Sequence, residues 1–127
     1  MTQKLHILVV DDEPSITSSL FWALRPLGHI VEGVNDGEQA LSKLSVDPSM
    51  DLVITDHSMP RMNGIELVRR LRGAGYQGKV IVLSAHLSQH NRTLYESLGV
   101  EVMLPKPFDV DALRQAIAEL FQDPATL

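Results

Sequence analysis

The sequence predicts a single α/β domain, a doubly wound five-stranded parallel sheet with five helices. Short apolar runs alternate with helical patterns along the chain, and no repeat, low-complexity tract or internal linker separates them. The 127 residues suffice for one domain with one sizeable core, but not comfortably for two. Parallel strands need long right-handed crossovers, which a helix after each strand supplies. We therefore expect one domain over residues 1–127, with its core at about 4–122.

Five runs are interpreted as strands because each is short, mostly apolar or β-branched, and ends on polar or turn-forming residues. The first run is apolar almost throughout, with His6 as the exception, as expected for a strand covered on both faces. The second alternates only weakly. The predicted strands are residues 5–10, 29–34, 52–55, 80–83 and 100–104.

A helical pattern follows each predicted strand. The first helix begins at Pro14, whose fixed φ and missing N–H suit a first helical position, and the preceding acidic residue suits an N-cap. Asp36-Gly37 gives the turn into the second helix, and Asp109 can cap the last one. The segment 87–98 has the weakest helical pattern because much of it is polar. The core-facing stripe expected on the first helix is Ile16, Leu20, Ala23, Leu24 and Leu27.

Composition excludes several classes of function. The net charge is −5, with 11 basic against 16 acidic residues, so no broad basic face is available for direct binding of nucleic acid. The longest apolar runs are far shorter than the roughly 20 residues that span a bilayer, and no signal peptide is evident. We expect a cytoplasmic protein without a membrane segment. The absence of cysteine excludes disulfides and thiol chemistry.

Polar residues follow four different predicted strands at the point where each strand ends. They are Asp11 and Asp12 after the first strand, Asp56 after the third, Ser84 after the fourth and Lys106 after the fifth. The carboxyl ends of parallel strands lie at one edge of a sheet, where ligands bind in open α/β folds. The sequence therefore predicts that these groups converge on one pocket.

Such a pocket suits phosphoryl transfer to a carboxylate. Three carboxylates that lie together repel unless a cation holds them, and an all-oxygen site partly open to water suits Mg²⁺. Asp56, which precedes a loop stiffened by Pro60, is the candidate nucleophile, and its product would be an aspartyl phosphate. Ser84 can donate a hydroxyl to the phosphoryl oxygens and Lys106 an ammonium charge. Considered alone, the stretch around Asp56 favours a carboxylate that only caps a turn, and it is the other polar groups at this edge that favour the nucleophile.

Four motifs together resemble the receiver domain of two-component response regulators over nearly the whole chain. They are Val9-Val10-Asp11-Asp12-Glu13, then Asp56 with Met59-Pro60-Arg61-Met62-Asn63-Gly64, then Ser84-Ala85, and finally Lys106-Pro107-Phe108. Each motif is weak alone, but their order and intervals make the combination specific. The resemblance implies a flavodoxin-like sheet with strand order 2-1-3-4-5.

The resemblance also implies a role for each matching residue. Asp56 would take the phosphoryl group from a phosphohistidine on a sensor histidine kinase or a phosphotransfer protein. Asp12, Asp56 and the backbone carbonyl of Ser58 would bind Mg²⁺ directly, and Asp11 would act through a metal-bound water. Ser84 and Lys106 would contact the phosphoryl oxygens. The domain would be no enzyme beyond its own phosphorylation and dephosphorylation.

In the family, phosphorylation repacks the face of the fourth helix, fifth strand and fifth helix, here residues 87–98, 100–104 and 109–121. This face would contact an output domain or a downstream target protein, or a second copy of the chain in a homodimer. One residue departs from the family pattern. Met103 stands three residues before the lysine, where an aromatic side chain is usual. The phosphorylation chemistry is thus better supported than the usual output mechanism.

Three alternatives remain at this stage. The chain could be a receiver fragment of a larger transcriptional regulator or hybrid kinase. A haloacid-dehalogenase-like phosphatase would place its nucleophile after the first strand in an Asp-x-Asp pattern, but the sequence there is Asp11-Asp12-Glu13. A flavodoxin-like electron carrier would need a loop rich in Ser, Thr and Gly at that position to hold the flavin phosphate.

Overall fold

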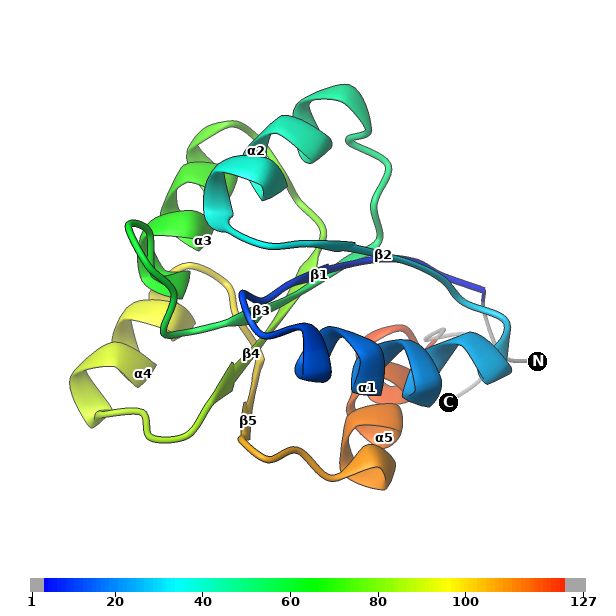
Figure 1. Cartoon of the computed structure of the whole chain (residues 1–127). Helices are drawn as coiled ribbons and strands as arrows, with labels where there is room; N and C mark the ends of the chain where they lie inside the picture. The colour runs from blue at the N-terminus through cyan, green and yellow to red at the C-terminus, as the bar shows by residue number, and fades with distance from the viewer. Residues whose placement is uncertain (1–3, 123–127) are drawn as a thin grey trace.

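The computed structural model contains one sheet of five parallel strands in the order β2-β1-β3-β4-β5 (Figure 1). It describes residues 4–122, and the outermost residues of the expected domain, 1–3 and 123–127, lie outside the described part. The predicted parallel sheet and its strand order are confirmed. The strands are β1 His6–Val10, β2 Ile30–Val34, β3 Leu52–Asp56, β4 Lys79–Ser84 and β5 Val102–Pro105.

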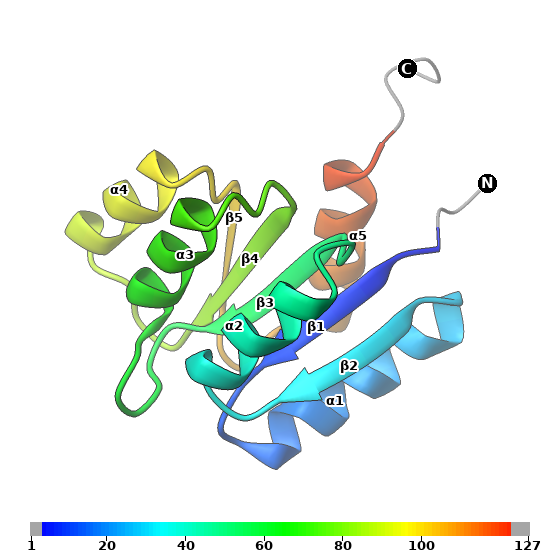
Figure 2. The same ribbon diagram turned by 90° about the horizontal axis from the view of Figure 1, so that it is seen from above.

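Helices cover both faces of the sheet, as Figures 1 and 2 show from two directions. On one face lie α2, α3 and α4, and on the other lie α1 and α5. The crossover from β1 to β2 runs one way across the sheet and the crossovers to β3, β4 and β5 run the other way, so right-handed connections place α1 on one face and α2, α3 and α4 on the opposite face, as in a doubly wound sheet. The helices are α1 Pro14–Leu24, α2 Gly37–Val46, α3 Gly64–Gly73, α4 Gln89–Ser97 and α5 Val110–Leu120.

The sheet is buried on both sides because successive residues of its strands point to opposite faces. In β1, Leu8 and Val10 pack under α2 and α3, whereas Ile7 and Val9 pack under α1 and α5. All four side chains are fully buried. Burying each such side chain stabilises the fold by about 1.5–3 kcal/mol, so the near-continuous apolar run predicted as a doubly covered strand fits its position.

Most helices begin with a side-chain cap at the carboxyl edge of the sheet. A side-chain oxygen at each N-cap accepts a hydrogen bond from a backbone N–H in the first turn, as predicted for Asp109. The capping residues are Asp36, Asn63, Ser88 and Asp109. At α1, Glu13 holds the N-cap position and Pro14 stands at N1, both as expected, although the Glu13 side chain makes no capping hydrogen bond.

The first helix ends earlier than its apolar stripe suggested. Leu20, Ala23 and Leu24 are buried, but Leu27 is 38% exposed because Arg25–Leu27 forms a 3₁₀ turn after α1. Pro26 cannot continue the α-helical hydrogen bonding, and Gly28 closes the turn with φ of 93°. The prediction that Leu27 lies in the core is therefore wrong.

The segment with the weakest helical pattern does form a helix, α4. Tyr95 is the buried residue of this helix. Within residues 4–122, no helix is both long enough and apolar enough to cross a bilayer.

Candidate functional site

Asp56 is the last residue of β3, the central strand of the sheet. Every residue of this strand is buried, and the Asp56 side chain is only 4% exposed. The Ser58 N–H donates to Asp56 Oδ1 over 3.4 Å, and the Lys106 ammonium lies 3.1 Å from Asp56 Oδ2. The rigid centre of the sheet thus fixes a buried carboxylate at its carboxyl edge.

Asp11 and Asp12 follow β1 and reach the same edge. The Asp11 N–H donates to Val34 O of the neighbouring strand, and its Oδ1 accepts the Glu13 N–H over 2.9 Å. These two bonds hold Asp11 in place, 2% exposed, whereas Asp12 is exposed. One carboxylate oxygen each of Asp11, Asp12 and Asp56 lies within 4.8 Å of the other two. The predicted cluster of three acids is present.

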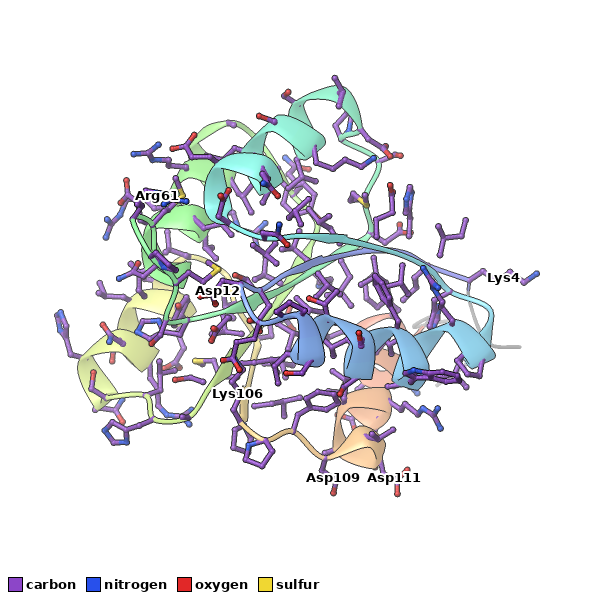
Figure 3. The ribbon with its side chains drawn as sticks, in the orientation of Figure 1. Lys4, Asp12, Arg61, Lys106, Asp109 and Asp111 are labelled. Carbon is purple, nitrogen blue, oxygen red and sulfur yellow. The ribbon has the colours of Figure 1, made fainter. Side chains whose placement is uncertain are left out.

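Lys106 reaches this cluster from the end of β5. Its backbone N–H donates to Ser84 O, and its ammonium lies 3.2 Å from Asp11 Oδ2 as well as 3.1 Å from Asp56 Oδ2. Its side chain is 13% exposed. Figure 3 shows Asp12 and Lys106 at one edge of the sheet, with Lys4 at the other. The structure therefore brings together residues from three strands that are distant in the sequence.

Ser84 lies at the same edge, but its hydroxyl is hydrogen-bonded to His86 and not to the acids. It is the last residue of β4 and pairs in register with Pro105. Its Oγ donates to His86 O over 2.7 Å and accepts the His86 N–H over 3.2 Å. Within the described chain, these turn contacts are the hydrogen bonds of the Ser84 side chain. To reach a group on Asp56, the hydroxyl must leave His86 O by rotating about χ1.

The charges of the cluster are unbalanced, with three carboxylates against one ammonium. Burial raises the pKa of Asp11, and the charge of Asp56 raises it further, although the Glu13 N–H and Lys106 act in the opposite direction. Burial lowers the pKa of Lys106, but its hydrogen bond to Asp56 and the charges of Asp11 and Asp56 outweigh burial, and the net shift is upward. Lys106 is therefore held protonated in a site that remains net negative.

The donor set fits a hard divalent cation. Asp11 Oδ2 is buried, and within residues 4–122 its polar contact is the ion pair with the Lys106 ammonium, 3.2 Å away. This oxygen therefore retains the capacity to accept a further ligand. Grouped carboxylate oxygens beside an exposed position, here Asp12, match the preference of Mg²⁺ for oxygen ligands and retained water.

A second feature beside the site was not predicted. Tyr95 of α4 is fully buried, and its hydroxyl lies 2.6 Å from Nδ1 of His57, the residue after Asp56. Sequence analysis noted only that 87–98 has few apolar anchors. The signal that could have identified Tyr95 is that it is the only aromatic residue in that segment.

The fold and the acidic carboxyl edge of the sheet are those of a signalling domain that accepts a phosphoryl group. Comparison with known proteins gives the family. Residues 7–118 match the model of the response regulator receiver domain, and the chain belongs to this family. It is 37% identical over 122 residues to sensor protein EvgS of Escherichia coli (strain K12), covering 96% of this chain and 10% of that protein. It is 44% identical over 103 residues to transcriptional regulatory protein CpxR of the same strain, covering 81% of this chain and 43% of that protein.

A solved structure agrees with the fold. Chemotaxis protein CheY4 of Vibrio cholerae matches with a TM-score of 0.86 at 27% identity, over 94% of this chain and 100% of that chain. The chain thus corresponds to a whole structure of one relative, but to a tenth of EvgS and less than half of CpxR. The family prediction is confirmed and favours the receiver over the phosphatase and flavin-carrier alternatives. The roles of the individual residues remain predictions.

Proposed function

We propose that Asp56 accepts a phosphoryl group from a phosphohistidine of a sensor histidine kinase or a phosphotransfer protein. The observation that carries this proposal is the position of the Asp56 carboxylate, buried at the end of the central strand between Lys106 and two further acids. A structural carboxylate would be expected to have its charge matched. Here a surplus of negative charge lies at the edge where open α/β sheets bind ligands.

In the proposed step, one carboxylate oxygen of Asp56 forms a bond to phosphorus while the bond from phosphorus to the donor imidazole nitrogen breaks. The imidazole leaves as the neutral ring after taking a proton from solvent, and Asp56 becomes a mixed anhydride. Lys106, 3.1 Å from the carboxylate, can remain beside the transferred group and pair with one of its oxygens. Ser84 can donate to another oxygen once its hydroxyl leaves His86 O.

We also propose that Asp12, Asp56 and the backbone carbonyl of Ser58 hold a Mg²⁺ ion, with Asp11 acting through a water molecule. The support is the three-acid cluster and the capacity of the buried Asp11 Oδ2 to accept a further ligand. When bound, such an ion offsets the negative charge of the phosphoryl oxygens. The chain's own acids provide the site, and Lys106 provides the fixed positive charge on the other side of Asp56.

The output surface is proposed to be the face of α4, β5 and α5. The relatives differ in what accompanies their receiver, since one is named a sensor protein and another a transcriptional regulatory protein. For this chain we propose a protein partner on that face, either an output domain, a downstream target or a second copy of the chain. Direct nucleic-acid contact is not expected of a domain with a net charge of −5.

The direct test is incubation with acetyl phosphate and Mg²⁺, followed by intact-protein mass spectrometry. We expect one phosphoryl adduct on the parent protein, no adduct on Asp56→Asn, and no adduct without a divalent cation. Asp51→Asn is a matched control because Asp51 precedes the same strand at its opposite end, where its carboxylate accepts the His6 N–H. An adduct that persists in Asp56→Asn, or that is lost equally in Asp51→Asn, would contradict the proposal.

A further inference from the structure

Helix α4 contacts the core through one buried residue and through half-buried leucines within it and at its ends. Among its 9 residues, Gln89–Ser97, only Tyr95 is buried, and it is 0% exposed. The half-buried Leu94 packs beside it at the edge of the same core. A helix with so few apolar contacts gains little stability from packing, so the contacts of Tyr95 contribute strongly to where α4 lies, together with the Arg72 hydrogen bond to Leu98 O at its end.

The polar contacts of Tyr95 are with the residue that follows Asp56. Its hydroxyl lies 2.6 Å from His57 Nδ1, and the two rings meet edge to face with centroids 5.6 Å apart and planes at 74°. On the other side of the imidazole, Asn91 Nδ2 lies 3.4 Å from His57 Nε2. Both ring nitrogens of His57 therefore face α4, and the side chain bridges the β3–α3 loop and this helix.

Gly64 makes room for this arrangement. A Cβ at position 64 would overlap the Tyr95 hydroxyl, so any larger residue there would push the hydroxyl away from His57. The Gly64 N–H donates to His57 O over 2.8 Å, which closes the loop 57–64 around the hydroxyl. Three residues from different elements thus form one specific hydrogen-bonded contact, which general apolar packing would not require.

The His57–Tyr95 pair is connected to Asp56 through both the backbone and charge. The His57 N–H donates to Leu83 O, next to Ser84, so the backbones of the two strands that carry Asp56 and Ser84 are joined at this point. Burial raises the pKa of Tyr95, and the charge of Asp56 raises it further. Burial lowers the pKa of His57, and the same charge opposes that shift. Both rings therefore experience the electric field of Asp56.

We propose that the His57–Tyr95 pair couples the phosphorylation state of Asp56 to the docking of α4. This inference rests on the proposed phosphorylation of Asp56, which replaces a carboxylate of charge −1 with an acyl phosphate of about −1.5 to −2 charges and places three acceptor oxygens beside His57. A change of charge and loop geometry at Asp56 alters the hydrogen bond that anchors α4, and the helix shifts or loosens. Met103, half-buried on β5 against the same core, has no group that could form such a bond.

The test is hydrogen exchange over α4, measured on the parent, Tyr95→Phe and His57→Phe with and without phosphorylation. In the parent, phosphorylation is expected to change the exchange rate of the amides in residues 89–97 by roughly five-fold, the factor equivalent to one hydrogen bond. Each variant retains an aromatic ring at the position but loses the polar atom, so we expect that the protein still gains one phosphoryl adduct and that the phosphorylation-dependent change over α4 falls to less than roughly two-fold. In the double variant, the loss of the phosphorylation-dependent change over α4 is expected to be no larger than in either single variant.

Tyr76→Phe is the matched control, because Tyr76 is a second buried tyrosine whose hydroxyl donates to Met50 O over 2.9 Å. It is expected to keep the parent's phosphorylation-dependent change. Absence of an adduct on the parent would reject the proposed function, and this inference with it, before any exchange is measured. If the parent is phosphorylated, an unchanged α4 response in Tyr95→Phe and His57→Phe would overturn the inference alone, as would a parent whose α4 does not respond.

Discussion

The sheet carries ionisable clusters at both ends of its strands, but within residues 4–122 only the cluster at the amino end gives each of its acids a basic partner. There, the Lys43 ammonium lies 2.8 Å from Glu32, and its hydrogen bond is the main cause of the lowered pKa of Glu32. The two ring nitrogens of His6 face Glu32 and Asp47. At the carboxyl edge, three acids lie together, and Lys106 pairs with two of them, Asp11 and Asp56, which leaves Asp12 without a basic partner among residues 4–122.

This difference separates a structural cluster from a functional one. A protein gains nothing in stability from burying unbalanced charge, because the desolvation cost exceeds what one partner returns. The paired groups around His6 are half-exposed and join β1, β2 and the end of α2. The acids around Asp56 are deeper and poorly matched, which is the arrangement expected where a cation and an anionic group bind.

The largest expected effect comes from replacing the lysine whose ammonium pairs with the acids at each edge. In buffer without divalent cations, Lys106→Met should lower the unfolding free energy by about 3 kcal/mol, because it leaves buried carboxylates uncompensated. Lys43→Met should cost far less, since its pair with Glu32 is open to water. Urea denaturation of both variants at pH 7.5 measures the difference. Equal losses would mean that the edges do not differ in buried charge.

The next effect is the response to Mg²⁺. At ten times its Kd, a ligand that binds only the folded state adds about 1.4 kcal/mol to the unfolding free energy. We expect this gain in the parent and its loss in Asp12→Asn, whose exposed side chain contributes little to folding itself. Thermal unfolding with and without MgCl₂ gives the measurement.

The matched control is Glu32→Gln at the amino edge, where His6, Glu32 and Asp47 also lie close enough together to hold a metal ion. It should retain the gain, because Lys43 and His6 already satisfy Glu32. A gain lost in Glu32→Gln and kept in Asp12→Asn would reverse the assignment of the two edges.

Sequence reasoning predicted the carboxyl edge well because one rule governs it. In a parallel sheet, the residues after each strand lie together whatever their separation in the chain. Asp11, Asp12 and Asp56 follow that rule, with carboxylate oxygens within 4.8 Å of one another, and Lys106 follows it in pairing with Asp11 and Asp56. Period and turn residues likewise placed the strands and helices, and the error at Leu27 concerns a single position near a helix end.

What the sequence could not provide are contacts decided by rotamers and by docking. Ser84 was placed at the correct edge, but its hydroxyl bonds to His86 O, a local turn that competes with any more distant partner. The His57–Tyr95 bond depends on the missing side chain of Gly64 and on how α4 approaches the β3–α3 loop. Neither of these two hydrogen bonds depends on hydrophobic periodicity, so the sequence pattern does not indicate them.

The smallest expected effect is a difference in how the two edges respond to acid. His29 is buried near the start of β2, its Nδ1 accepts the Leu5 N–H, and burial lowers its pKa from the ordinary 6.5. As the pH falls through 6.5, the unfolded chain binds a proton that the folded protein refuses, so stability is lost until the pH reaches the folded pKa. The slope from this one proton is less than about 1.4 kcal/mol per pH unit.

His29→Asn tests this, because an amide oxygen can accept the Leu5 N–H but does not titrate in this range. From pH 7 to 5 the parent should lose stability relative to His29→Asn. For Asp11 the change in stability has the opposite sign. Its raised pKa means that the folded protein binds the proton before the unfolded chain does, so the parent should gain stability relative to Asp11→Asn as the pH falls toward 3.8. Urea denaturation in metal-free buffer measures both differences. If acid changed the stability of the parent in the same direction relative to both variants, the contrast between the two edges would be wrong. Acid is expected to relieve repulsion only at the carboxyl edge, where three acids lie together.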